Sequence, residues 1–314
     1  MIVDGEGSVK SSESNEDFTR ISQSFGSKAQ ENTEGYLVKK PYPGKSTLKK
    51  DLIFIKSIYN NCHVCINNCR VDRKYRMGKC KSRFHKNIYL AQTGYEEEKI
   101  ISPSYLIYFN GCNLKCNYCH QKEWMNIENI SYWVSYSRIL KDIRENEKSI
   151  RSISFLGGNP DQSILTFFEL IELLIKSNIK VPLVWNTNLT CNSFVIDILN
   201  QYIDVYLVDI KFGDNLCAKE ISGAQSYWEN MLLNLDLIES DNPIIVRHLP
   251  LPQHFECCTL PILHLIKGFR FPYQLSLLES LYDDNGKEIQ KALIAAKNLK
   301  ITNHIEGDFD GFNS

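Results

Sequence analysis

Three cysteines in one short loop are the residues of this chain whose type and spacing most clearly suggest chemistry. Cys112, Cys116 and Cys119 follow the spacing C-x3-C-x2-C within the segment GCNLKCNYCHQKEW. A closed zinc site usually takes four protein ligands. Three thiolates instead suit three corners of a cubane [4Fe–4S] cluster, which leaves the fourth iron open for a chelating ligand. Unligated structural thiols are disfavoured, because free cysteines have no reason to keep ligand spacing.

A second cysteine group lies upstream with the spacing C-x2-C-x3-C-x10-C, and it consists of Cys62, Cys65, Cys69 and Cys80. Four thiolates can close a zinc site or hold a second iron–sulfur cluster, and the spacing favours the cluster only slightly. Basic residues interleave with these cysteines and would offset the charge of a tetrathiolate: Arg70, Arg73, Lys74, Arg76 and Lys79. We predict a bound metal in preference to free thiols, with a structural role in a small segment that has little core of its own.

The composition excludes several classes of protein. The 314 residues include 11 cysteines, an odd number that does not fit a disulfide framework. Lys and Arg (36) balance Asp and Glu (37), so no charge excess indicates a nucleic-acid or membrane-surface partner. No apolar run reaches the roughly 18–20 residues of a membrane helix, and the first residues lack a secretory signal pattern. We predict a cytoplasmic protein.

The elements that must position these cysteines are short strands alternating with helical patterns. Apolar runs predict strands at 105–109, 152–156, 181–185, 205–210, 243–249 and 271–277, and periodic patterns predict helices at 164–177 and 193–202. The strands are nearly continuous in apolar residues, which is typical of parallel strands covered by helices. We therefore predict an α/β fold, a partial (β/α)6 TIM-like barrel.

The same patterns predict a division of the chain into four parts. Residues 1–46 are rich in polar residues and are predicted to be a disordered tail. A cysteine-rich, metal-binding lobe follows at 47–100, the partial barrel at 101–280, and a C-terminal helix with a tail at 281–314.

Polar residues and glycines gather where the predicted strands end, and in parallel barrels this is where ligands bind. They are Gly157, Gly158 and Asn159 after the second strand, Asn186 and Asn188 at the third, Asp209 and Lys211 at the fourth, and Arg247 and His248 at the fifth. His248 is either a proton donor or a polar residue satisfied within the fold.

Cys257 and Cys258 are adjacent and precede a predicted amphipathic helix. One of them is an activated thiol if the helix N-terminus lowers its pKa; otherwise both are packing residues. Cys191 and Cys217 are predicted to be core thiols.

The cysteine loop after the first strand resembles that of the radical S-adenosylmethionine (SAM) superfamily. Residues 62–258 more specifically resemble the PflX-like group, which is related to pyruvate formate-lyase activating enzymes. The segments that carry this resemblance are CHVCINNCRVDR, FNGCNLKCNYCH, FLGGNPD, VWNTN, YLVDIKFGDNLCAKEISG and IVRHLPLPQHFECCT. After about residue 270 the sequence no longer shows the strand signature that is usual in this family.

The resemblance implies a role for most strand-end residues. Gly157 and Gly158 would meet the amino group of SAM, and Asn159 stands where the superfamily more often has an acidic residue. Asn186, Asn188, Asp209 and Lys211 would line the ribose and the carboxylate, Tyr118 would lie beside the adenine, and Arg247 is counted with these cofactor-binding residues. Cys257, Cys258 and His248 are the catalytic candidates.

The resemblance further implies reductive cleavage of SAM at a [4Fe–4S] cluster and hydrogen abstraction by a 5′-deoxyadenosyl radical. An electron donor such as flavodoxin or ferredoxin would supply the electron. A glycyl residue of a partner enzyme is one substrate, and a small molecule or another peptide is the competing one. Two alternatives without SAM turnover are an iron–sulfur electron-transfer or redox-sensing protein and a zinc-stabilised interaction protein.

Overall fold

The computed structural model describes residues 37–125, 130, 132–239, 242–269, 273–278, 286–301 and 304–306. The strands are β1 (Ile88–Gly94), β2 (Ser104–Phe109), β3 (Ser152–Gly157), β4 (Leu183–Thr187), β5 (Val205–Asp209), β6 (Ile244–His248), β7 (Tyr273–Leu277) and β8 (His304–Glu306). The α-helices are α2 (Lys45–Asn60), α3 (Tyr136–Asn146), α4 (Ile164–Lys176), α5 (Ser193–Leu199), α6 (Asn215–Ser222), α7 (Tyr227–Leu237), α8 (Leu260–Lys267) and α9 (Lys287–Asn298). Short 3₁₀ turns span Glu123–Met125 and Pro160–Ser163, and a π-helical turn, η4, spans Phe255–Thr259.

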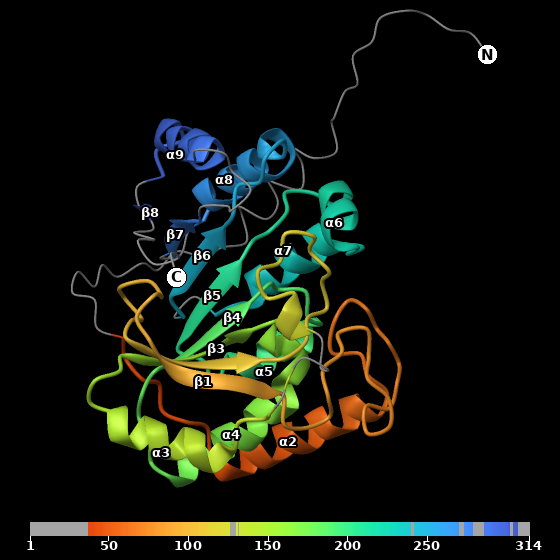
Figure 1. The fold of residues 1–314 in the computed structure, drawn as a ribbon, viewed down its shortest axis with the longest axis vertical. Coiled ribbons are helices and arrows are strands. Elements are labelled where there is room, and N and C mark those ends of the chain that lie inside the picture. Colours follow the sequence, from red (N-terminus) through yellow and green to blue (C-terminus); the bar gives the residue numbers. More distant parts are fainter. Residues whose placement is uncertain are drawn as a thin grey trace, which may run out of the picture.

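The strands form one open sheet in chain order, from β1 at one edge to β8 at the other. β1 runs antiparallel to β2, and every following pair is parallel. α2, α3 and α4 lie on one side of the sheet near β1–β3, and α8 and α9 lie beside β6 and β7 (Figure 1). The parallel strands bring their carboxyl ends to one edge, so the loops that follow them share one mouth.

The outer face of the sheet carries the main core. α4 buries eight of its thirteen residues, because it lies between the sheet and α2 and has apolar residues around most of its circumference. Phe155 of β3 and Trp185 of β4 pack against Phe167 of α4, with ring centroids 5.0 Å apart in both cases. This aromatic cluster fixes the helix layer on the strands.

The inner face of the sheet carries a second, smaller core. Val184, Leu207 and Ile245 come from three neighbouring strands, and Ile101 from the segment between β1 and β2 packs on them. All four side chains are almost fully buried. The loop that enters the barrel therefore fills its interior below the mouth.

The predicted partial barrel is confirmed, and each of the six predicted strands overlaps one of β2–β7. β1 and β8 were not predicted: β1 is an antiparallel edge strand, and β8 has only three residues. The predicted helices at 164–177 and 193–202 correspond to α4 and α5. The predicted C-terminal part, 281–314, contains α9. The rest of this part lies partly outside the described residues, at 281–285, 302–303 and 307–314.

Two predicted boundaries differ from the structure. Residues 1–36 of the predicted disordered tail lie outside the described residues, but residues 37–44 are packed on the barrel, and α2 begins at Lys45. Lys39 forms an ion pair with Asp204 at 3.1 Å. Within the segment 47–100, predicted to be a cysteine-rich metal-binding lobe, α2 packs on α4 and β1 belongs to the main sheet. None of the helices in the described ranges is both long and apolar enough to cross a membrane.

Candidate active site

The loop that follows β2 carries Cys112, Cys116 and Cys119, as predicted, and all three are free, half-buried thiols. Both ends of the loop are anchored. The Cys112 amide donates to the carbonyl of Cys80 at 3.1 Å, and the Lys115 amide donates to the carbonyl of Ser222 in α6 at 3.0 Å. The three sulfurs are thus positioned between the upstream cysteine segment and the end of α6.

The thiols of this loop fit a cluster with several irons. Burial raises the pKa of Cys112 and Cys116, and the Lys211 ammonium opposes that rise. Buried thiolates of this kind need cationic partners, which a bound metal centre provides. A single ion requires donor atoms within about 4.8 Å of one another. Among the described residues one group meets this condition, and it does not include the three cysteines of this loop. Three thiolates on separate irons of a [4Fe–4S] cluster are spaced more widely, so this donor set suits that cluster.

The glycine turn after β3 lies directly against the start of the cysteine loop. Gly157 has a φ of 117°, and a Cβ there would lie 2.5 Å from the backbone nitrogen and oxygen of Phe109, so only glycine fits. The amide of Gly158 donates to the Phe109 carbonyl, and the amide of Asn159 donates to the Gly111 carbonyl, both at 2.9 Å. The structure thus brings the predicted turn to the cysteine loop.

Asn159 belongs to a buried amide network beneath this turn. Its Nδ2 donates to Asp161 at 3.0 Å and contacts the amide oxygens of Asn188 (3.2 Å) and Asn113 (3.3 Å). The indole of Trp185 donates to the other Asp161 oxygen at 2.8 Å. Asn159 and Asn188 are each 2% exposed, and in this arrangement their side-chain amides support the mouth. The ligand contacts that the resemblance implies for them stay a prediction.

Lys211 and Asp209 form an ion pair at the mouth, where Lys211 Nζ lies 3.0 Å from Asp209 Oδ2. Asn186 Nδ2 lies 3.4 Å from the other Asp209 oxygen. Burial opposes the charge of Lys211, but the Asp209 carboxylate and the neighbouring Tyr118 and Cys116 raise its pKa well above the ordinary value. Lys211 is therefore a held cation beside the cysteine loop, and Tyr118 adjoins it.

Arg247 does not face the ligand region as predicted. Its guanidinium donates to Glu98 from Nε and from Nη2, each at 2.7 Å, and reaches Glu97 at 3.2 Å. Burial disfavours the charged guanidinium and by itself would lower the pKa of Arg247, but the two carboxylates raise that pKa above its ordinary value. The residue thus ties the segment between β1 and β2 to β6, because its donors are engaged by that segment.

His248 is satisfied within the fold. Its Nδ1 lies 2.9 Å from the carbonyl oxygen of Ile210, and its Nε2 lies 3.0 Å from Oγ1 of Thr259. Burial lowers the pKa of His248 to about 4, so the ring is neutral near pH 7. Only 1% of the residue is exposed. Of the two predicted roles, this environment favours a polar residue satisfied within the fold over a proton donor.

The upstream cysteines are brought together by the segment between α2 and β1. A Cβ on Gly78 would lie 3.3 Å from the Cys69 sulfur and 3.8 Å from the Cys80 sulfur, so both sulfurs flank this glycine. Burial raises the pKa of Cys62 and Cys65, and the other thiols of the group add to that rise. The four predicted ligands thus share one neighbourhood.

Arg73 provides the cation of this neighbourhood. It is 3% exposed and donates from Nη1 to the carbonyl of Gln162 at 2.6 Å. Its positive charge opposes the rise that burial causes in the pKa of Cys62. The guanidinium also lies over the ring of Tyr59, 4.3 Å from its centroid. A buried guanidinium beside thiols favours their ionised, metal-binding form.

Sequence reasoning missed one group. Cys217 of α6 lies beside His254, Cys257 and Cys258, and their donor atoms all lie within 4.8 Å of one another. Cys217 is a predicted core thiol. It lies 37 positions from His254, so no ligand spacing in the sequence links the two. Burial raises the pKa of the Cys258 thiol. Cys258 lies in the π-helical turn η4, before α8 begins.

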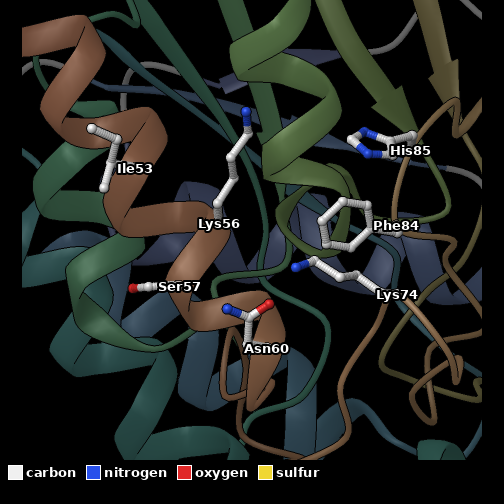
Figure 2. A pocket seen from close by; sticks show the side chains of 7 residues that line it. All are labelled: Ile53, Lys56, Ser57, Asn60, Lys74, Phe84 and His85. Carbon is white, nitrogen blue, oxygen red and sulfur yellow. The ribbon is translucent and has the colours of Figure 1, made fainter.

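Two cavities lie at the surface of the described part of the chain. One, of about 490 Å³, is lined by Asn117 and Tyr118 of the cysteine loop, Ile221 of α6, and residues 251–254. The other, of about 420 Å³, lies between α2 and the segment carrying Lys74, Phe84 and His85 (Figure 2). Only the first adjoins predicted site residues.

Comparisons with known proteins agree with this site. The family model described as Radical SAM superfamily matches residues 106–260, which include the cysteine loop and the strand ends. An uncharacterized protein of Methanocaldococcus jannaschii, MJ0674, is 30% identical over 269 residues, which cover 78% of this chain and 77% of the relative. The chain belongs to the radical SAM superfamily.

Other similar proteins match over a smaller part of the chain or at lower identity. The 7-carboxy-7-deazaguanine synthase of Clostridium acetobutylicum is 30% identical over 95 residues, 29% of this chain and 41% of that protein. SuiB of Streptococcus suis is 16% identical with a TM-score of 0.46, and the match covers 64% of this chain and 47% of SuiB. A domain of pyruvate-formate lyase-activating enzyme from Bacteroides vulgatus is 16% identical with a TM-score of 0.40, over 48% of this chain and 94% of that domain. This chain thus spans about half the length of SuiB, and its own substrate remains to be proposed.

Proposed function

We propose that this radical SAM protein cleaves SAM reductively and uses the resulting radical to abstract hydrogen from a substrate at the barrel mouth. The cysteine loop carries the proposal, because it offers three thiolates and no fourth. When Cys112, Cys116 and Cys119 hold a reduced [4Fe–4S] cluster, that cluster supplies the electron that breaks the C5′–S bond of SAM and yields methionine and a 5′-deoxyadenosyl radical.

The chain's own residues bind and orient the nucleotide in this proposal. Lys211 presents a positive charge to the carboxylate of SAM, and Asp209 holds that ammonium in place through a 3.0 Å contact. The backbone of Gly157 and Gly158 lies against the cysteine loop and offers carbonyl oxygens to the amino group. Tyr118 provides an aromatic face for the adenine beside the same loop.

The substrate is proposed to enter through the 490 Å³ cavity next to Tyr118. Its wall includes exposed loop residues, Asn117 and Gln253, so a segment of another protein can reach it from solvent. This supports a glycyl residue of a partner enzyme as the substrate class, in line with the resemblance to activating enzymes. A small redox protein such as flavodoxin or ferredoxin would deliver the electron.

The upstream cysteines are proposed to hold a second metal centre, either an iron–sulfur cluster or zinc. The Cys112 amide bonds the carbonyl of Cys80, so this centre would brace the start of the catalytic loop. Its role would be structural, because the segment 61–87 has no regular helix or strand of its own.

The test of SAM cleavage is anaerobic reconstitution followed by incubation with SAM and dithionite. The wild-type chain is expected to form 5′-deoxyadenosine, and Cys116→Ala to form none, because the cluster loses one of its three ligands. Cys191→Ala, a buried thiol outside the loop, is the matched control and should keep the product. Formation of 5′-deoxyadenosine by Cys116→Ala would remove the loop from the reaction. An iron content of about eight per chain indicates a second [4Fe–4S] cluster. An iron content of about four, with zinc that is lost in Cys69→Ala, indicates zinc upstream.

The glycyl substrate has a separate test that does not require knowing the partner. Lysate from cells grown on glycine deuterated at Cα is separated into protein and small-molecule fractions, and each is incubated with the enzyme, SAM and dithionite. Deuterium in 5′-deoxyadenosine is expected with the protein fraction. Transfer only with the small-molecule fraction would contradict the glycyl substrate while leaving SAM cleavage intact.

A further inference from the structure

Four side chains with metal-ligand chemistry meet outside the loop of Cys112, Cys116 and Cys119. Cys217 Sγ lies 2.9 Å from Cys257 Sγ and 3.6 Å from His254 Nδ1. His254 Nδ1 lies 3.3 Å from Cys257 Sγ, and the Cys258 sulfur completes the group within 4.8 Å of the others. They come from two segments at the barrel mouth: Cys217 lies in the first turn of α6, and the other three lie at and in the π-helical turn η4 after β6.

Four donor atoms this close together suit a single ion. The separations of 3.3 Å and 3.6 Å are near those of a zinc tetrahedron, and the 2.9 Å between the Cys217 and Cys257 sulfurs would widen when the ion binds. Zinc binds thiolate sulfur at about 2.3 Å and imidazole nitrogen at about 2.0 Å in a tetrahedron, which places the ligand atoms about 3.5–3.8 Å from one another. A cubane cluster would need its thiolates on different irons and hence farther apart. Three cysteines and one histidine also form one of the usual donor sets of structural zinc.

We propose that Cys217, His254, Cys257 and Cys258 bind one zinc ion, a site separate from both the catalytic cysteine loop and the upstream cysteines.

The backbone around the four ligands is already in place for such a site. Asp214 caps α6 by accepting a hydrogen bond from the Cys217 amide at 2.7 Å, which fixes the first ligand. Gly213 lies against the turn that carries the other thiols, because a Cβ there would come within 2.7 Å of Cys258 Cα. The Cys258 amide donates to the His254 carbonyl at 2.9 Å. The two loops therefore approach each other without side-chain obstruction.

Burial differs among the ligands in a way that fits a closed site with access from solvent. Cys217 and Cys258 are buried, whereas His254 and Cys257 are half-buried. An ion can therefore reach the group from the His254 side and then be enclosed by the buried thiols. The π-helical turn presents Cys257 and Cys258 together, and such turns are frequent at functional sites.

A disulfide between Cys217 and Cys257 is the competing interpretation of their 2.9 Å separation. A disulfide would use two of the four groups and leave His254 and Cys258 beside it without a role. One ion uses all four donors, and it keeps the thiols reduced. The convergence of a histidine on three sulfurs therefore favours metal.

The site would position a wall of the substrate cavity. His254 lines that cavity together with Tyr118 and Ile221, and Ile221 of α6 accepts a hydrogen bond from the amide of Asn117 in the cysteine loop at 3.1 Å. A zinc ion joining α6 to the loop after β6 would hold both sides of the cavity at a fixed separation. Its proposed role is positioning, because its ligands belong to α6 and the segment after β6 and not to the cysteine loop.

The experiment measures zinc in the full-length chain purified anaerobically. Wild type and Cys191→Ala, a buried cysteine elsewhere, are expected to hold the same zinc content, and His254→Ala and Cys257→Ala each to hold about one zinc less per chain. Both altered residues are half-buried, and thermal unfolding checks that the variants are folded. His254→Cys should retain the ion, and X-ray absorption at the zinc edge should show sulfur replacing nitrogen.

Three results would overturn the proposal. The first is equal zinc content in wild type, His254→Ala and Cys257→Ala. The second is a Cys217–Cys257 disulfide in a non-reduced digest of zinc-free wild-type protein. The third is iron in place of zinc that disappears in these variants. None of these results depends on whether SAM is cleaved, so the proposal stands or falls separately from the proposed function.

Discussion

Arg247 and Glu98 form a two-pronged ion pair across the barrel interior, with Nε and Nη2 of the guanidinium each 2.7 Å from a different carboxylate oxygen. The side chains are 14% and 6% exposed. Glu98 belongs to the segment between β1 and β2, which also supplies Ile101 to the inner core. The pair therefore fastens the segment that fills the barrel, and breaking it should loosen that segment from the sheet.

Arg247→Met is expected to lower the free energy of unfolding by about 3–5 kcal/mol, because it leaves buried carboxylates without their cation. Anaerobic urea unfolding of the full chain measures this. Arg138→Met is the control: Arg138 forms an exposed pair with Asp142 one helical turn away and should cost less than about 1 kcal/mol. Adding Glu98→Gln to Arg247→Met should restore part of the loss. Equal effects at positions 138 and 247 would contradict the assignment.

Glu97 is expected to matter much less than Glu98. Burial raises its pKa, and the Glu98 charge raises it further against the effect of Arg247. Glu97→Gln removes a carboxylate that the fold disfavours and keeps an acceptor for Arg247. We therefore expect Glu97→Gln to leave the unfolding free energy within about 1 kcal/mol of wild type, measured in the same urea series.

His248 makes stability depend on pH in a defined direction. Burial lowers its pKa to about 4 in the folded chain, below the value of about 6.5 in the unfolded chain. As the pH falls below about 6.5 the unfolded chain takes up the proton first, so the stabilisation present at neutral pH is lost progressively until pH 4. Between pH 7 and pH 5 this single group should lower the unfolding free energy by about 2 kcal/mol.

Comparison of wild type with His248→Gln isolates this contribution. The glutamine cannot take up a proton, so the variant should lose about 2 kcal/mol less than wild type between pH 7 and pH 5, whatever its stability at pH 7. Urea unfolding of both proteins at the two pH values gives the difference. Identical pH dependence in the two proteins would show that His248 is not held neutral in the fold.

Lys211→Gln is expected to weaken SAM binding about ten-fold, because a charge-assisted contact to the carboxylate becomes a neutral one. Lys219→Gln changes an exposed lysine on α6 and is the matched control. Isothermal titration of the cluster-loaded protein with SAM measures both. Unchanged affinity in Lys211→Gln, with normal cluster content, would show that the Asp209–Lys211 pair only closes the barrel mouth.

The fold could be predicted largely from the sequence, because each buried parallel strand is a local apolar run of the right length. The chain segments of β2–β7 carry such runs, whereas β8 has three residues and no recognisable pattern. β1 alternates between buried and more exposed positions toward its end, as an edge strand does, and this weaker pattern was missed. The pairing of β1 with β2 joins part of the predicted 47–100 lobe to the main sheet. This pairing depends on register across the sheet, which composition does not reveal.

The sequence by itself determined the cysteine loop, because Cys112, Cys116 and Cys119 lie within eight residues and their spacing is a local property of the chain. Only the tertiary structure decided what Arg247 and Cys217 do. Arg247 meets Glu98 across 149 positions, and Cys217 meets Cys257 across 40, so no spacing pattern could pair them. Cys217 and Cys257 meet because parallel strands bring the segments that follow β5 and β6 to one mouth. Arg247 and Glu98 meet because the segment between β1 and β2 packs inside the barrel, where a buried charge requires a partner of opposite charge.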